Sequence, residues 1–265
     1  LAVAQGADDA ETLARVAHAY AMMDRVDDAG AYYVEAAAKD TAFTDQAVSD
    51  LMWLARGARE REDRFAMASA AETALRLRPG LGVADMSLDL ARHYFRNQEY
   101  GRALPFYQKV LGEAADSIPE VVFEVAQAHE AIGDCAHALL FFERFREMVR
   151  AWERGEVDWY IGTCAFDLAM EIRAGRDRGD RRLNAALAHL DRVLDLGEPR
   201  NLQARAWFEK GRILSDVGDC AGAMEAFSQV RYSDNAGSLV NRAQALFDEI
   251  RFGRGLEPLR DGRCR

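Results

Sequence analysis

Three side chains with metal-binding potential lie close together in the sequence, at His129, Cys135 and His137. Imidazole nitrogen and thiolate sulfur are ligands that zinc prefers, and structural zinc sites use four of them. The helical pattern described below places His129 at a packing position of one helix and His137 on the exposed side of the next. We therefore predict no metal site and no cofactor.

Other sequence patterns that resemble catalytic motifs are better explained by helix structure. Gly80-Leu-Gly82 begins like a dinucleotide-binding fingerprint, but no strand pattern precedes it and no third glycine follows. Pro79-Gly80 is instead typical of a helix terminator. Nucleophile elbows, Walker phosphate loops and zinc-protease motifs are absent from the sequence. The chain is predicted not to be an enzyme.

The amino-acid composition favours a helical protein with a sizeable core. Of 265 residues, 49% are hydrophobic, and 5 prolines and 20 glycines supply little turn material for a many-stranded sheet. No run of about 18 uncharged apolar residues is present, so no membrane-spanning helix is predicted. The formal net charge of −10 argues against nucleic acid or an anionic lipid surface as the main partner.

A mostly small residue recurs early in the second helix of each expected helical hairpin, and a mostly bulky residue follows it four positions later. Another small residue recurs in the first helices. Two helices approach to about 8 Å only where the facing side chains are small, and bulky neighbours then fill the gaps. The second-helix pairs are Ala29 and Tyr33, Met67 and Ala71, Ala103 and Tyr107, Ala138 and Phe142, Ala186 and Leu190, and Ala223 and Phe227; the first-helix residues are Ala17, Ala55, Ala91, Ala126 and Gly211.

This order of small and bulky residues resembles the tetratricopeptide repeat (TPR) family, whose unit is about 34 residues long. Thr-Ala-Leu-Arg-Leu-Arg-Pro at 73–79 is similar to the end of that repeat, and Trp207 with Gly211 is similar to its first-helix pair. The resemblance implies an all-α fold, a right-handed superhelical solenoid of about six helix-turn-helix repeats in a single domain, 1–265. The expected repeats are 10–43, 48–81, 84–117, 119–152, 157–200 and 204–233, followed by a capping helix at 236–252 and a basic tail at 253–265.

The fifth repeat departs from this pattern, because the spacing between the small residues Ala138 and Ala186 grows to 48 residues. We expect the surplus to lengthen the helix through Phe145 and Trp152 and to enlarge the Arg-rich loop at 173–182.

The TPR resemblance also implies a binding surface, since the first helices of that family line a concave groove that holds protein segments. We expect this groove to bind an acidic and apolar segment of a partner protein, or a subunit of a larger complex. Its arginines would pair with carboxylates and its aromatic side chains would accept apolar groups. The residues carried over to groove positions are Met52, Arg56, Arg59, Arg92, Phe95, Arg96, Phe123, Phe208 and Arg212.

Two alternatives stay open for these residues and for the function. The arginines can pair with Glu60, Asp85 and Asp89 of the chain itself and only keep the surface soluble. Alternatively, the insertion around Trp152 and Trp159 forms a pocket, in which case the chain is an enzyme or a small-ligand-binding protein.

The four cysteines leave room for two disulfides or for four free thiols. In stacked hairpins a second helix runs antiparallel to the next first helix, so Cys220 should start its helix near the end of the capping helix. The tail that carries Cys264 emerges there, and a bridge between these two is expected to be within reach. Cys135 is placed similarly opposite the first helix that contains Cys164.

Disulfides would place the protein outside the cytoplasm. Arginine outnumbers lysine 31 to 3, as expected of a GC-rich bacterial genome, and the chain begins at Leu1 rather than Met, as a processed chain or an internal fragment does. We expect a periplasmic or membrane-associated bacterial protein, with a cytoplasmic protein as the alternative. Residues 1–50 carry a net charge of −7 and the last fifteen carry +3, which makes head-to-tail self-association a further option.

Overall fold

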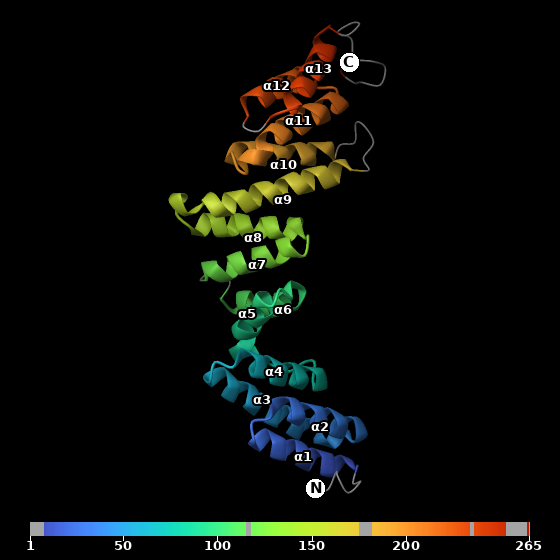
Figure 1. Ribbon diagram of the computed structural model, residues 1–265, viewed down its shortest axis with the longest axis vertical. Coiled ribbons are helices and arrows are strands. Elements are labelled where there is room, and N and C mark those ends of the chain that lie inside the picture. Colours follow the sequence, from blue (N-terminus) through green and yellow to red (C-terminus); the bar gives the residue numbers. More distant parts are fainter. Residues whose placement is uncertain (1–7, 115–117, 175–181, 234–235, 253–263, 265) are drawn as a thin grey trace. The chain divides into compact units, whose positions relative to one another are not determined.

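The computed structural model describes residues 8–114, 118–174, 182–233, 236–252 and Cys264. Over these residues the chain forms α-helices and short 3₁₀-helices and no strand (Figure 1), which confirms the all-α prediction. The chain divides into two compact units, residues 1–115 and 116–265. The single domain expected above, its right-handed twist and its number of repeats stay predictions.

In the first unit, consecutive helices pair as antiparallel hairpins. The second helix of the first hairpin also packs against both helices of the next one, and the fourth helix packs against the fifth. The pairs are α1 (Ala10–Met22) with α2 (Val26–Lys39), α3 (Thr44–Glu60) with α4 (Arg64–Leu77), and α5 (Ser87–Arg96) with α6 (Tyr100–Ala114), with the 3₁₀-helices η2 (Thr41–Phe43) before α3 and η3 (Ala84–Met86) before α5.

The second unit continues the same pattern, and each helix packs against the one that follows it. The last helix packs against the two helices before it, as expected of a cap. The elements are α7 (Pro119–Ala131) with α8 (Cys135–Met148), η4 (Ala151–Glu153), α9 (Gly155–Arg173) with α10 (Leu183–Leu196), α11 (Arg200–Val217) with α12 (Cys220–Gln229), η5 (Val230–Tyr232) and the cap α13 (Leu239–Phe252).

The connection between α8 and α9 differs from the expectation of one helix running through Trp152. Helix α8 ends at Met148, because Val149 and Arg150 adopt extended backbone with ψ of 157° and 155°. The Glu153 carboxylate then accepts a hydrogen bond from the Arg150 backbone N–H at 3.1 Å and caps the short η4 helix. The surplus residues therefore enter η4, the 19-residue helix α9 and the connection at 174–182, of which 175–181 lie outside the described residues.

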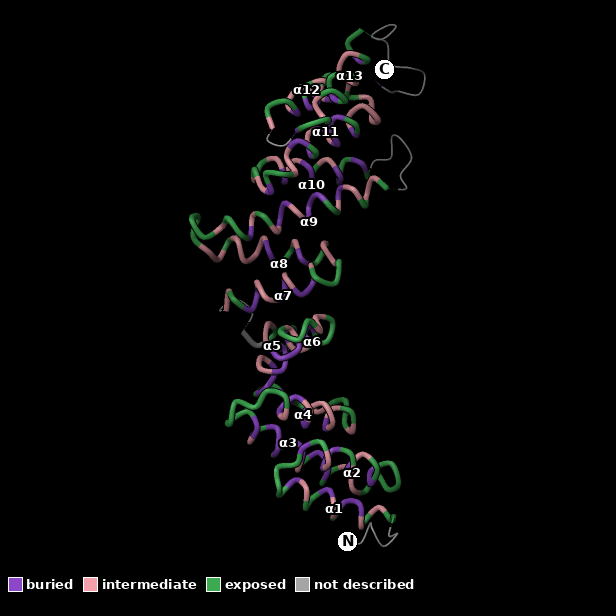
Figure 2. The backbone as a smooth tube through the Cα atoms, in the orientation of Figure 1, coloured by how far each residue is buried: buried purple, intermediate pink, exposed green. Residues whose placement is uncertain are grey.

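The recurring small and bulky positions face the core, as predicted from their spacing. Ala17, Ala55, Ala91 and Ala126 of the first helices are completely buried, and so are Tyr33, Tyr107 and Phe142 of the second helices. Figure 2 shows such buried positions recurring along the helices of each unit. In the last hairpin, a Cβ added to Gly211 would lie 2.6 Å from the Phe227 ring. The absence of a side chain at Gly211 thus makes room for an aromatic ring, the steric relation that the repeat pattern implies.

Five hairpins share a turn residue with left-handed backbone, located where the first helix ends. The residue is glycine in two later hairpins, Gly133 (φ 80°) and Gly218 (φ 88°), but it is Asp24, Glu62 and Gln98 in the first three, with φ near 60°. The left-handed conformation costs a residue with a Cβ about 1–2 kcal/mol, whereas glycine adopts it freely.

Replacing Gln98 with glycine is therefore expected to stabilise the first unit by about 0.5–1 kcal/mol, because the relief of the left-handed conformation exceeds the entropy that glycine loses on folding. The matched substitution Gly133→Ala introduces the same cost in the second unit and should destabilise it by about 1 kcal/mol. Urea unfolding of both variants measures the two free energies. A loss of stability in Gln98→Gly would contradict the explanation.

Candidate functional site

The arginines expected in the groove of the first unit are held between its second and third hairpins. The Arg56 guanidinium on α3 lies 3.2 Å from the Asp85 carboxylate on η3, and Arg59 lies 2.6 Å from Asp89 on α5. These side chains are about half exposed. Both pairs agree with the alternative in which these arginines pair with carboxylates of the chain itself. Exposed ion pairs contribute at most about 1 kcal/mol, however, so a carboxylate of a binding partner can compete for each guanidinium.

Three further groove residues of the first unit lie on α5. Arg92 is half-buried and Arg96 is exposed. Phe95 is half-buried because its ring packs edge-on against Tyr100 and Tyr107 of the following helix, with ring centroids 5.3 and 6.3 Å apart. Helix α5 thus presents two arginines and the accessible part of one ring.

Of the four other residues expected in the groove, three are buried or half-buried and the fourth, Arg212, is exposed. Met52 is 5% exposed and Phe208 is 2% exposed, so neither side chain lines an open surface. Phe123 is half-buried in a cluster of rings, with centroids 4.7 Å from Phe145 and 5.8 Å from Tyr160. Arg212 lies over the Phe208 ring, 6.0 Å from its centroid, and 3.4 Å from the Glu209 carboxylate. Phe208 and Phe123 belong to apolar clusters of the second unit, whereas the Arg212 side chain is exposed.

Trp53 is an exposed aromatic residue that is not among the groove positions transferred from the TPR family. It is 58% exposed on α3, directly after the buried Met52. Residues three and four apart share a helix face, so Trp53, Arg56 and Glu60 lie on one side of α3. A large exposed ring is the informative exception on a protein surface. The signal was present in the sequence as a tryptophan three residues before an arginine on an expected first helix.

A hydrogen-bond network anchors this face of α3 to the first hairpin. The buried Tyr33 hydroxyl on α2 donates to the Asp50 carboxylate on α3, and the same carboxylate oxygen lies 2.7 Å from Nδ1 of His18 on α1. Burial, and then the hydrogen bond and charge of Asp50, raise the pKa of Tyr33 above its ordinary value. The neutral hydroxyl therefore holds the carboxylate one helical turn before Trp53 and positions that side of α3.

Two clefts of the first unit lie along its second helices instead. One of about 580 Å³ is lined by the starts of α2 and α4, including Asp27 and Phe65. Another of about 610 Å³ is formed mainly by α4 and α6, including Glu72 and Phe106. Neither cleft contains a residue expected to bind the partner, so the candidate surface is a helix face and not one of these clefts.

In the second unit, the three residues considered as metal ligands have different partners. His129 and His137 both contact Asp134, whereas Cys135 contacts Cys164. Asp134 caps α8, and its Oδ2 lies 3.1 Å from Nδ1 of His129 and 2.7 Å from Nδ1 of His137. The ligand atoms of these three residues lie within 4.8 Å of one another. Partial burial opposes ionisation of Asp134, but hydrogen bonds from the backbone and side chain of His137 and from His129 hold its pKa below the ordinary value. Cys135 instead contacts Cys164, with the sulfurs 2.7 Å apart.

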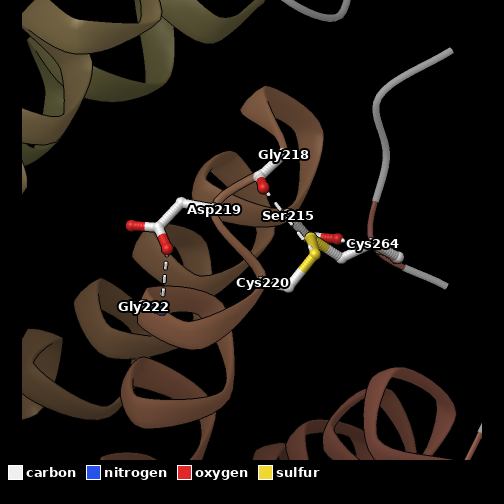
Figure 3. The surroundings of a disulfide bond; sticks show 6 residues. All are labelled: Ser215, Gly218, Asp219, Cys220, Gly222 and Cys264. Carbon is white, nitrogen blue, oxygen red and sulfur yellow. Dashed lines mark hydrogen bonds between the residues drawn. A yellow bond between two sulfur atoms is a disulfide. The ribbon is translucent and has the colours of Figure 1, made fainter. Parts of the chain in front are cut away.

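Cys220 and Cys264 form a disulfide, the pairing expected from the hairpin arrangement (Figure 3). Their Cα atoms are 5.2 Å apart, and the two cysteines lie 44 positions apart in the sequence. Two hydrogen bonds accompany the bridge: the Ser215 hydroxyl donates to the Cys264 carbonyl at 3.2 Å, and the Cys264 N–H donates to the Ser215 carbonyl at 3.4 Å. The bridge therefore ties Cys264 to the end of α11 and the start of α12.

Comparison with known proteins adds few constraints. No family model matches the chain, and no curated protein matches its sequence. Among solved structures, the C-terminal part of a TPR repeat-containing protein from Cytophaga hutchinsonii is 12% identical, with 91% of this chain and 90% of that chain covered and a TM-score of 0.38. BtubC (BKLC) from P. vanneervenii is 15% identical, with 95% of each chain covered and a TM-score of 0.32.

The fold is defined by how the helices of the chain pair and pack. Consecutive helices pair as hairpins in both units, and small residues face bulky ones in the cores. Within the described ranges, no helix has the length and apolar composition that crossing a membrane requires. By the pairing and packing of its helices, the chain is an all-helical protein built from consecutive helical hairpins.

Proposed function

We propose that the chain is a non-catalytic interaction scaffold that binds a segment of a partner protein on the first-helix face of the first unit. This surface, called the α3–α5 surface below, is defined by six residues. They are Trp53, Arg56, Arg59, Arg92, Phe95 and Arg96.

The observation that carries the proposal is the exposed Trp53 ring on the same helix face as Arg56. Tryptophan and arginine are the residue types that dominate binding energy at protein interfaces, because a ring buries much apolar area and a guanidinium pairs with carboxylates in a fixed geometry. Arg59 and Arg96 extend the basic character of this face in a chain whose net charge is −10. These features support a partner segment with acidic and apolar side chains.

The cellular location belongs to the same proposal. Structural disulfides persist in oxidising compartments, and the bridge between Cys220 and Cys264 supports a protein outside the cytoplasm. We propose a periplasmic or membrane-associated bacterial scaffold.

Charge reversal at Arg92 and Arg96 together should weaken binding of an acidic, apolar peptide at least about tenfold, because two attractive charges become repulsive. Fluorescence anisotropy with a panel of peptides that combine glutamates with leucine or tryptophan provides the measurement, at two salt concentrations. Affinity for the unmodified chain should fall steeply with salt. Trp53→Ala should weaken binding without changing the salt dependence.

The matched control is Arg64→Glu with Arg76→Glu, which changes the net charge equally through two exposed arginines of α4. This control should retain most of the affinity. Equal weakening by both double variants would show that only net charge matters, and unchanged binding by Arg92→Glu with Arg96→Glu would remove the α3–α5 surface as the binding site.

A further inference from the structure

Cys135 and Cys164 form an adjacent pair of thiols that the scaffold function does not use. Cys135 is the first residue of α8, and Cys164 lies in the middle of α9, the next α-helix along the chain. Both cysteines are free, and their sulfur atoms are 2.7 Å apart. A disulfide bond is about 2.05 Å long, whereas unbonded heavy atoms usually pack at about 3.5–4.0 Å. The two sulfurs therefore need only a small shift to bond.

The two thiols differ in access to solvent. Cys135 is half-buried, and Cys164 is completely buried among the side chains that pack α8 against α9. A reagent from solution therefore reaches Cys135 first. This combination of an accessible sulfur and a buried neighbour is what a stepwise thiol–disulfide exchange requires, since one sulfur attacks and the other resolves the mixed disulfide.

The surroundings also make Cys135 the better nucleophile. The hydrogen bond between the two thiols lowers the pKa of Cys135, although burial and the nearby carboxylates of Asp167, Glu130 and Asp134 oppose this. Cys135 also lies at the start of a helix, where the positive end of the helix dipole stabilises a thiolate. The hydrogen bond with Cys135 and burial raise the pKa of Cys164 well above its ordinary value.

The other cysteine pair shows that this helix position accommodates a bridge. Cys135 follows Gly133-Asp134 and Cys220 follows Gly218-Asp219, and in both places the aspartate caps the second helix of a hairpin. Cys220 is bonded to Cys264. The same local structure therefore presents a cysteine sulfur toward a neighbouring segment in two hairpins.

We propose that Cys135 and Cys164 are a reactive dithiol that exchanges with small-molecule or protein disulfides, with Cys135 as the attacking residue. The Cys135 thiolate attacks one sulfur of the incoming disulfide, forms a mixed disulfide and releases the other sulfur as a thiolate. The Cys164 sulfur then attacks the Cys135 sulfur and its proton passes to the departing sulfur, so the second half of the incoming disulfide leaves as a thiol. The two cysteine sulfurs are oxidised by two electrons and the incoming disulfide is reduced by two. The product is a bridge that joins α8 to α9.

The experiment uses the full chain with oxidised glutathione as the probe, followed by alkylation and peptide mass spectrometry. In the unmodified protein we expect loss of both thiols and appearance of the Cys135–Cys164 bridge, with Cys220–Cys264 unchanged. Cys164→Ala should accumulate glutathione on Cys135. Cys135→Ala should leave Cys164 unmodified while circular dichroism shows a folded protein.

A second measurement does not depend on the variants. Brief treatment of the unmodified protein with limiting iodoacetamide should label Cys135 at least about tenfold faster than Cys164. Two thiols that stay alkylatable after oxidation of the folded chain would overturn the proposal. So would glutathione on Cys164 in folded Cys135→Ala, or equal labelling rates for the two cysteines.

Discussion

Replacing Cys264 with serine is expected to lower the free energy of unfolding of the second unit by as much as about 4 kcal/mol. The disulfide joins two cysteines that lie 44 positions apart in the sequence, and in the chain-entropy description a loop of that length restricts the unfolded chain by about this amount. The substitution also removes a side chain that is 6% exposed within the cluster formed by α11, α12 and α13. Urea unfolding followed by circular dichroism, with and without a reductant, measures the effect.

The reductant supplies the control for this experiment. It should lower the stability of the unmodified protein to that of Cys264→Ser and leave the variant unchanged. Cys135→Ser should keep the full response to reductant, since Cys135 is not part of this bridge. A loss below about 1 kcal/mol in Cys264→Ser would contradict a stabilising bridge.

A second large effect is expected at Gly162, in the interior of α9. A Cβ added there would overlap the Glu198 carbonyl oxygen and lie 2.6 Å from Cδ of Pro199, in the connection that precedes α11. The atoms that an added Cβ would meet belong mainly to the backbone of Glu198 and to the proline ring, which cannot move away as the end of a flexible side chain can. Gly162→Ala should therefore destabilise the second unit by about 3 kcal/mol, the upper range for overpacking a core.

Gly155 provides a matched control in the same helix. An added Cβ there meets no atom within 4 Å, and glycine costs a helix about 0.5–1 kcal/mol relative to alanine. Gly155→Ala should therefore leave the stability unchanged or raise it slightly. Thermal unfolding of both variants compares the two sites directly, and equal stabilities would show that α9 does not approach the 198–199 connection this closely.

The sequence predicted the hairpins well because their signal is repeated and steric. Mostly small residues stand where helices approach, and the bulky residues four positions later lie on the same face of the same helix. The same arrangement led to the pairing of Cys220 with Cys264, because it places the start of one helix near the end of another. The positions of the core residues and of Cys220 depend on the spacing of the repeats and on the direction of each helix, and both can be inferred from the sequence.

The candidate surface was predicted less well, because it depends on the rotation of single helices and on the ends of elements. Met52 was placed on the groove and Trp53 was not, although a rotation of one residue, about 100° of helix, exchanges them. The end of α8 at Met148 depends on the Glu153 cap, which competes locally with an apolar pattern that continues to Trp152. The sequence indicates a left-handed turn residue at Gly133 and Gly218, because glycine favours that conformation. It gives no such indication at Glu62 and Gln98, where a residue with a Cβ adopts the same conformation.

The bond between Cys220 and Cys264 also changes what a protease can accomplish. It converts the chain from 220 to 264 into a covalent ring, which contains α12 and α13. A single cut anywhere in that ring leaves both fragments attached, so the nicked protein keeps its full mass until it is reduced. Digestion analysed on paired gels, with and without reductant, would therefore reveal cleavage in this part of the chain only in the reduced lane.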